Sequence, residues 1–207
     1  MQIKNPIYNE FLKLGLIKKK NITKICNQTR DKRIGVFKDK KTSIIFLEKF
    51  SANSNYWHSL EKIDKKSKKE NTIYTNLLGG KTVKSKSLDD HQRRFLVFKK
   101  YFKNKTILDF GCSWGDLLVK LRNYSRSCSG IEVKQHCINY IKRNYKFISI
   151  QNKLDNFNSN FDIITLFHVL EHIPYQVETL KKLRKKLSRN GKIIIEVPHA
   201  QDFLILT

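Results

Sequence analysis

One ten-residue stretch, 107–116, constrains the fold of this chain more than any other. Thr106 to Leu108 form an apolar run that is typical of a buried strand, Gly111 and Gly115 bracket a tight turn, and apolar residues then recur at helical spacing. The stretch therefore predicts a strand, a glycine turn and a helix. In a doubly wound sheet such a turn lies at the carboxyl end of the first strand, where glycine lets a ligand approach the backbone.

Further apolar segments alternate with helical patterns downstream of this turn. Strands are predicted at 129–133, 147–150, 161–167 and 193–197, and a helix at 88–102 leads into the first strand. Two more helices carry their apolar residues on one face: Ile138, Ile141 and Tyr145 in one, and Val177, Leu180, Leu183 and Leu187 in the other. The second is predicted to end at Ser188–Gly191, with the glycine in the left-handed conformation. This alternation indicates an α/β domain with a parallel sheet and right-handed crossovers.

An N-terminal α+β extension precedes that domain. Residues 6–17 are predicted as a short amphipathic helix with Asn5 as its cap and Pro6 at its first position. Two β-rich segments, 34–37 and 42–47, flank a charged turn and predict a hairpin. The predicted domains are residues 1–87 and residues 88–207.

The charge of the chain is strongly basic, and the excess lies mostly in the first half. The formal net charge is +24, of which residues 1–104 carry +17 and residues 105–207 carry +7. A basic extension of this kind can attract an anionic acceptor, such as a nucleotide-linked sugar or RNA. A lysine-rich surface that only faces solvent explains the same charge, and nucleic acid is not the favoured partner.

Cysteine spacing and hydropathy narrow the class of protein. The four cysteines, at 26, 112, 128 and 137, form no Cys-x-x-Cys pair, which argues against a zinc site and a disulfide framework. No apolar run approaches the roughly 18 residues that a membrane span needs, and the first twenty residues are polar and basic. We therefore expect a cytoplasmic protein with no membrane partner and no bound metal.

Glu132 stands 21 residues past Gly111, at the tip of the second predicted strand. In nucleotide-binding sheets an acidic residue at about this distance binds the ribose hydroxyls, because one carboxylate can accept both hydrogen bonds. The spacing predicts that Glu132 has this role. An exposed acidic residue at a strand end would be the structural alternative.

The segment 109–115, Asp-Phe-Gly-Cys-Ser-Trp-Gly, resembles motif I of the class I S-adenosylmethionine methyltransferases. The segment 161–173 is similar to motif IV of the branch that includes ubiquinone-pathway and sugar methyltransferases. The resemblance covers residues 105–197 and implies a Rossmann-like doubly wound sheet that binds S-adenosylmethionine. Residues 34–47 and Tyr56–Trp57 are also similar to the N-terminal region of sugar methyltransferases.

The resemblance also implies which residues bind the cofactor. Asp109, Gly111 and Gly115 would hold its methionine end, Glu132 its ribose and Asn152 its adenine region. Lys153 and Asp155 in the same loop are alternatives to Asn152. Ser113 replaces the glycine that is usual in the motif. The complete set of implied cofactor-binding residues is Asp109, Gly111, Cys112, Ser113, Gly115, Glu132, Val133, Asn152, Leu166 and Phe167.

Two histidines are candidates for the base that removes the acceptor proton. His172 is the first choice and His168 the second, because imidazole titrates near neutral pH. Glu171 would orient His172 or cap the following helix, and a purely structural histidine is the alternative for His172. The pattern His168-x-x-Glu171-His172 is also similar to the Glu-x-x-Glu-His metal motif of small-RNA 3′-end methyltransferases and of some ubiquinone-pathway enzymes. Histidine replaces the first Glu of that motif, a change that would favour softer metals than Mg²⁺.

The family resemblance further implies a sheet of seven strands, whereas the sequence ends after the fifth. We therefore expect either a C-terminally truncated product or a sheet that another chain completes. The leading hypothesis is methyl transfer to oxygen or carbon of a small polar acceptor such as a nucleotide-linked sugar. The alternatives are an RNA methyltransferase that uses the basic extension, and a catalytically incomplete module that binds S-adenosylmethionine or a partner.

Overall fold

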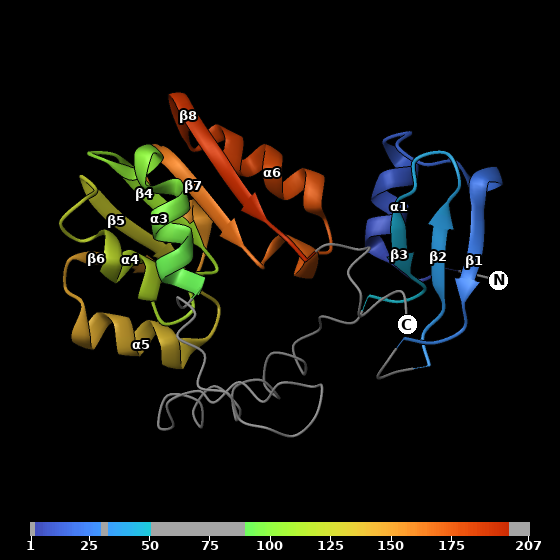
Figure 1. Cartoon of the computed structure of the whole chain (residues 1–207), viewed down its shortest axis with the longest axis horizontal. Helices are drawn as coiled ribbons and strands as arrows, with labels where there is room; N and C mark the ends of the chain where they lie inside the picture. Colours follow the sequence, from blue (N-terminus) through green and yellow to red (C-terminus); the bar gives the residue numbers. More distant parts are fainter. Residues whose placement is uncertain (1–2, 30–32, 51–89, 199–207) are drawn as a thin grey trace. The chain divides into compact units, whose positions relative to one another are not determined.

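A computed structural model describes residues 3–29, 33–50 and 90–198 (Figure 1). These residues fall into two compact units. The first contains residues 3–29, 33–50, 167–185 and 195–198, and the second contains residues 90–166 and 186–194. Tyr56 and Trp57, and the predicted domain boundary at residues 87 and 88, lie outside the described residues.

A five-stranded sheet has the order β6-β5-β4-β7-β8. Its strands are β4 (Thr106–Phe110), β5 (Ser127–Ile131), β6 (Ile148–Gln151), β7 (Phe161–Phe167) and β8 (Leu187–Glu196). The pairs β4/β5, β4/β7 and β5/β6 are parallel. The first strand of this sheet, β4, lies in its middle. The next two strands, β5 and β6, lie on one side of β4, and β7 and β8 lie on the other, as in a doubly wound fold. The predicted fold class is therefore confirmed, and its switch point lies between β4 and β7.

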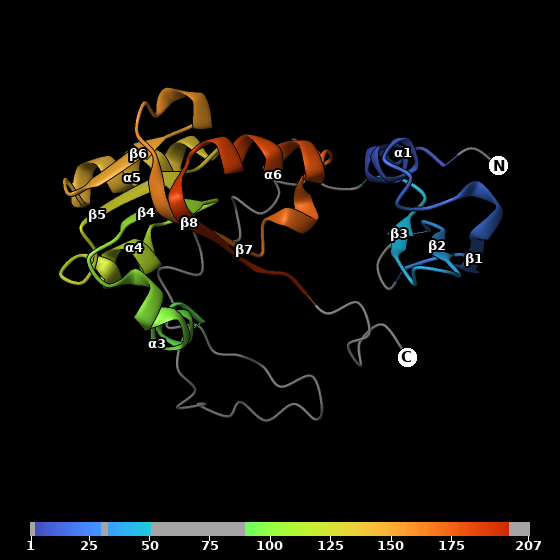
Figure 2. The same ribbon diagram turned by 90° about the horizontal axis from the view of Figure 1, so that it is seen from above.

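Helices connect these strands. They are α3 (Asp90–Phe102), α4 (Asp116–Leu121), α5 (Gln135–Asn144) and α6 (Gln176–Lys185). Helix α3 lies beside α4, and α5 lies beside β6 (Figures 1 and 2). Fully buried side chains of the second unit include Leu108 in β4, Leu118 in α4 and Ile141 in α5. None of the described helices has the length and apolar character that crossing a bilayer requires.

The N-terminal segment folds as a helix on a three-stranded antiparallel sheet. It contains α1 (Pro6–Lys13), β1 (Ile22–Cys26), β2 (Val36–Asp39) and β3 (Ile45–Leu47), in the sheet order β1-β2-β3. The predicted hairpin is confirmed as β2/β3, whereas β1 was not predicted. Asn5 caps α1 by accepting a hydrogen bond from Ile7 N at 2.9 Å. The helix ends earlier than expected because Gly15 adopts a φ of +69°.

The end predicted for the last helix is wrong. Helix α6 stops at Lys185, and β8 begins at Leu187, so Leu187 belongs to the strand. Gly191 is not among the glycines of positive φ. It is required for a different reason: a Cβ on Gly191 would lie 2.9 Å from the Phe161 carbonyl oxygen. The glycine therefore permits a close approach to β7 and does not cap a helix.

Candidate functional site

The turn after β4 is held by backbone hydrogen bonds within the turn and to the end of β5. Gly111 N and Cys112 N both donate to Ile131 O, at 2.8 and 3.0 Å, and Gly115 N donates to Cys112 O at 2.8 Å. Gly111 and Gly115 both have a φ of +81°, a conformation in which a side chain would be strained. The glycines thus bend the chain back onto the end of β5.

Ser113 is the residue of this turn that departs from the motif. Its φ is +50°, in the left-handed region that costs a residue with a side chain about 1–2 kcal/mol. Its backbone N–H donates to Glu132 Oε2 at 2.8 Å. Hydrogen bonds to charged groups contribute about 1.5–3 kcal/mol, enough to offset the backbone strain.

Glu132 is buried at the tip of β5, where it joins two loops. Its Oε1 accepts from Val133 N at 2.8 Å and Lys134 N at 2.9 Å, while Oε2 accepts from Ser113 N. The structure therefore brings the carboxylate to the turn, as the sequence spacing predicted. Val133, the next residue, is 67% exposed and presents an apolar surface beside the carboxylate.

Asp109 is a second buried carboxyl group, close to the end of β4. It accepts a hydrogen bond from Thr165 Oγ1 of β7 at 2.7 Å. Burial raises the pKa of Asp109 to about 6, and the charge of Glu132 adds to this, while the Thr165 hydrogen bond and the charge of Arg94 act in the opposite direction. The group therefore changes its charge close to physiological pH.

Arg94 is a buried charged residue that acts on Asp109 and that the sequence analysis did not predict. It lies on α3, is only 6% exposed, and its positive charge acts on Asp109. The signal was present, because Arg94 stands four residues before Phe98 and eight before Phe102, on the same helix face. A charged residue on the apolar face of a helix is seldom buried without a partner.

Cys112 lies in the turn, and Asn152 lies in the loop after β6. Cys112 is buried, and its Sγ lies where a side chain at Gly130 would point, 2.6 Å from the position of a Cβ. Burial, together with the charges of Asp109 and Glu132, raises the pKa of this thiol. Asn152 is exposed in the loop after β6, where its Oδ1 accepts from Asn156 Nδ2 at 3.2 Å.

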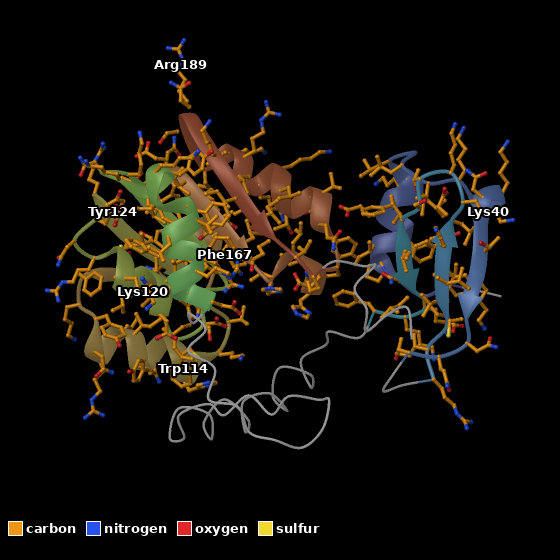
Figure 3. The ribbon with its side chains drawn as sticks, in the orientation of Figure 1. Lys40, Trp114, Lys120, Tyr124, Phe167 and Arg189 are labelled. Atoms are coloured by element: carbon orange, nitrogen blue, oxygen red, sulfur yellow. The ribbon has the colours of Figure 1, made fainter. Side chains whose placement is uncertain are left out.

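Trp114 anchors the turn to helix α5. Its ring lies 5.2 Å from His136 and 5.2 Å from Tyr140, both on α5, measured between ring centroids. Figure 3 shows Trp114 beside this helix. The aromatic contacts add to the hydrogen bonds that fix the turn.

The three candidates for proton transfer lie together in the first unit. His168 Nδ1 is 3.4 Å from Glu171 Oε1, and His172 Nε2 is 3.9 Å from the same oxygen. Glu196 at the end of β8, which the sequence analysis missed, lies 3.2 Å from His168 Nε2. His168 has a φ of +55°, and its N–H donates to Glu196 O at 2.8 Å. Glu196 therefore contacts both the strained backbone and the imidazole of His168.

The pKa of His172 is lowered, and one oxygen of Glu171 accepts no hydrogen bond from the described residues. Burial lowers the pKa of His172; the charge of Glu171 raises it and that of His168 lowers it further. The imidazole is therefore neutral at pH 7 and able to accept a proton. Glu171 Oε2 is a buried oxygen that accepts no hydrogen bond within the described part of the chain.

Metal binding has no support in this cluster. Across residues 3–29, 33–50 and 90–198, no three His, Cys, Asp or Glu side chains are arranged to hold a metal ion.

Leu166 is fully buried at the end of β7, and Phe167, labelled in Figure 3, is the last residue of that strand.

Comparison with known proteins adds a family and distant relatives. A family model described as a methyltransferase domain matches residues 84–205. The ubiquinone biosynthesis O-methyltransferase of Hydrogenovibrio crunogenus is 28% identical over 98 residues, which cover 43% of this chain and 41% of that protein. The tRNA U34 carboxymethyltransferase of Campylobacter fetus subsp. fetus is 30% identical over 109 residues, 48% of this chain and 38% of that protein.

Among solved structures, the SAM-bound amino pentose methyltransferase CalS10 from Micromonospora echinaspora is similar with a TM-score of 0.42 and 16% identity. The match covers 54% of this chain and 49% of that one. The chain spans less than half the length of the curated relatives that it matches.

Proposed function

The chain belongs to the methyltransferase-domain family, and from this membership we propose that it transfers a methyl group from S-adenosylmethionine to oxygen or carbon of a small acceptor. The observation that carries the proposal is the hydrogen bond from Ser113 N to Glu132 Oε2. It joins a glycine turn to an acidic strand tip, the two features that bind a nucleoside at this edge of a doubly wound sheet.

S-adenosylmethionine supplies a methyl group on a sulfonium sulfur, whose S–CH₃ bond breaks with both electrons left on sulfur, giving S-adenosylhomocysteine. Little chemistry then remains for the protein. Its residues must align the acceptor and take the acceptor proton.

The residues around the turn fit this cofactor. Asp109 and Arg94 form a buried pair of opposite charges, and we assign them to the ammonium and carboxylate groups of the methionine end. Glu132 is assigned to the ribose and the exposed Val133 to the adenine face. Asn152, Leu166 and Phe167 remain predicted contacts.

The assignment of Glu132 has one condition. A carboxylate offers about four acceptor positions. Three of them are taken by the N–H groups of Ser113, Val133 and Lys134. One ribose hydroxyl can therefore bind directly, and a second requires that Glu132 exchange one of these backbone hydrogen bonds.

For the base we propose His172, with His168 and Glu171 as positioning residues. A neutral imidazole held beside a carboxylate can take a proton and is then stabilised as the cation. The lowered pKa of His172 and its 3.9 Å separation from Glu171 support this role.

The identity of the acceptor is less constrained. The curated relatives act, by their names, on ubiquinone intermediates or on a tRNA uridine, so they share no acceptor class. The predicted nucleotide-linked sugar has no support from the described residues. An RNA acceptor on the basic extension is the alternative, because one relative modifies tRNA.

Calorimetry with S-adenosylhomocysteine tests the proposal. Glu132→Ala should weaken binding by about 1.5–3 kcal/mol, roughly tenfold or more, because a charged hydrogen-bond acceptor is removed. Glu178→Gln, a change of an exposed carboxylate on α6, serves as the control and should leave the affinity unchanged. Equal affinity of the wild type and Glu132→Ala would refute the assignment of Glu132.

A further inference from the structure

One edge of the sheet in the second unit gathers the amino ends of the parallel strands β4, β5 and β6. The loops before β4 and β5 are joined by a backbone hydrogen bond from Asn104 N to Tyr124 O at 3.0 Å. The loop before β6 joins them through Phe147, whose ring centre lies 4.9 Å from the guanidinium carbon of Arg122. These loops and the last turn of α3 therefore form one surface. We call it the amino edge, and it consists of residues 99–105, 122–127 and 145–147.

The amino edge is strongly basic. It holds seven Lys and Arg side chains and no Asp or Glu, and all seven are exposed: Lys99, Lys100, Lys103, Lys105, Arg122, Arg126 and Lys146. The opposite end of the same strands, where the turn after β4 lies, carries the carboxyl groups of Asp109, Asp116 and Glu132. Positive charge is thus concentrated at one end of the sheet, where it can attract a polyanion.

Ion pairs do not neutralise these cations. None of the seven forms an ion pair with another described residue. Asp162, at the start of β7, has its pKa lowered first of all by the Thr106 N–H. The charges of Lys105 and Arg126 act on it more weakly. The amino edge therefore keeps a positive charge that the phosphates of a nucleic acid can neutralise.

Aromatic rings lie among the cations of the amino edge. Lys99 Nζ is 5.5 Å from the centre of the Tyr124 ring, and Arg122 lies over the Phe147 ring. Because Arg122 is exposed, the face of its guanidinium that is turned away from the ring can receive a base. Proteins that bind single-stranded nucleic acid combine cations for the phosphates with aromatic rings and guanidinium planes on which bases stack.

Amide side chains stand between the cations on the same loops. Asn104 and Asn123 are exposed, and neither side chain forms a hydrogen bond with a described residue. An amide oxygen accepts from a hydroxyl, and an amide N–H donates to one. The ribose of RNA brings such a hydroxyl, the 2′-OH, whereas the sugar of DNA does not. The amino edge therefore offers partners for phosphates, bases and the 2′-OH together.

We propose that the amino edge binds single-stranded RNA. Its Lys and Arg side chains contact the phosphates, and bases stack on the Arg122 guanidinium and on the rings beside it. The amino edge lies at the opposite end of the strands from the turn at 111–115, as the places of Tyr124 and Trp114 show (Figure 3). RNA bound here leaves the proposed cofactor site open, so the inference does not depend on the proposed function.

Two double variants that remove equal charge test the place of binding on the full chain. The probe is a fluorescein-labelled oligouridylate of about 12 nucleotides, and fluorescence anisotropy gives its Kd between about 50 and 200 mM NaCl. Lys103→Gln/Arg122→Gln changes the amino edge, whereas Lys40→Gln/Lys41→Gln changes the exposed turn between β2 and β3 (Figure 3). The first should weaken binding roughly tenfold or more at about 50 mM salt and lower the salt slope by about 1.4, since each phosphate contact contributes about 0.7. The second should change neither.

Equal weakening by the two double variants would mean that net charge alone binds the oligouridylate. Weakening by Lys40→Gln/Lys41→Gln alone would place the RNA on the N-terminal extension. Either result overturns the inference, and so does a wild-type protein that does not bind the oligouridylate. Circular dichroism checks the folding of each variant, and all four substituted side chains are exposed.

Arg122→Lys tests the stacking of bases. It keeps the charge and loses the guanidinium plane, so it should weaken binding of the oligouridylate about five- to tenfold. Binding of inorganic polyphosphate, a polyanion without bases, should not change when it is measured by calorimetry. Arg126→Lys, on the same loop but without a ring contact among the described residues, is the matched control and should change neither. Equal effects of Arg122→Lys on the two probes overturn the stacking of bases.

Three further ligands test the class of partner. Oligodeoxyuridylate of the same length lacks only the 2′-OH and should bind several-fold more weakly, and an RNA duplex should also bind more weakly because its bases are already stacked. Equal or tighter binding of the deoxy strand overturns the choice of RNA, and tighter binding of the duplex overturns the choice of a single strand. Binding of phosphatidylserine vesicles without binding of the oligouridylate, lost in Lys103→Gln/Arg122→Gln, assigns the amino edge to a membrane and overturns the inference.

Discussion

Glu10 of α1 and Val177 of α6 are 167 positions apart in the chain, yet Glu10 Oε2 accepts the Val177 N–H at 3.1 Å. The other oxygen, Oε1, accepts from Glu178 N at 3.0 Å. A carboxylate from the N-terminal segment thus caps the helix that follows the histidine cluster. These two N–H groups have no partner within the helix, and they and the positive end of the helix dipole both favour a negative charge at this place.

Replacement of this cap should weaken the first unit. Glu10→Ala is expected to lower the free energy of unfolding by about 1 kcal/mol, as other helix caps do. Urea denaturation followed by far-ultraviolet circular dichroism measures the change. Glu178→Ala, which removes an exposed ion pair to Lys182 and an acidic side chain from the first turn of α6, should cost about 0.5 kcal/mol. Equal losses in the two variants would show that the Glu10 contact does not act as a cap.

Ser113 should be unusually sensitive to the shape of its side chain. Ser113→Val is expected to lower the free energy of unfolding by about 1–2 kcal/mol, because a β-branched residue is poorly tolerated at a φ of +50°. The matched control is Ser149→Val at an exposed position of β6, where extended backbone favours valine. A loss in both variants, measured by urea denaturation, would point to hydroxyl contacts and not to backbone strain.

Asp109 should make stability depend on pH between about 4 and 6. Its pKa is raised from 3.8 to about 6, so the folded state binds more protons than the unfolded state in this window. The free energy of unfolding therefore falls as pH rises through it, by up to about 3 kcal/mol, and Asp109→Asn removes this part of the slope. Denaturation of both proteins at pH 4, 5, 6 and 7 measures the difference.

Asp162 supplies the control of opposite sign. Hydrogen bonds, first of all from Thr106 N, lower its pKa despite some burial. Its contribution to stability is present at neutral pH and is lost as pH falls below the ordinary value for Asp. If Asp109→Asn and Asp162→Asn changed the pH profile in the same direction, the interpretation of Asp109 would be wrong.

His172 should govern the acidic side of the activity profile. Because its pKa is lowered, the base is lost only below the ordinary histidine value of about 6.5, where kcat/KM should fall. His172→Gln should reduce kcat about 100-fold and flatten this side of the profile. Formation of S-adenosylhomocysteine by the full chain provides the measurement. His91→Gln, on α3, is the control and should keep the wild-type profile; loss of the acidic side in that variant would exclude His172 as its origin.

Local sequence patterns predicted the elements that a few neighbouring residues determine. The glycine turn at 111–115, the cap at Asn5 and the strand at 161–167 each have a signature within a few consecutive residues, and the structure has all three. Periodicity also predicted the parallel sheet, because buried parallel strands are apolar throughout.

Several contacts between distant segments were not predicted, although the approach of Glu132 to the turn was. The burial of Arg94 was not predicted, because a charged residue is seldom buried without a partner and its partner, Asp109, lies in another element. Glu196 and Glu10 act on residues far away in the chain, so spacing carried no sign of them. Leu187 fitted both a helix face and a strand, and the pairing with β7 decided between them.

The sulfur of Cys112 lies against Gly130, so the reactivity of Cys112 reports when the turn opens. An alkylating reagent attacks thiolates that it can reach, and Cys26 is exposed while Cys112 is enclosed and has a raised pKa. Labelling of Cys112 therefore requires that the turn separate from β5. The rate of that labelling, followed by mass spectrometry with Cys26 as the internal reference, records how often the cofactor end of the fold loosens in solution.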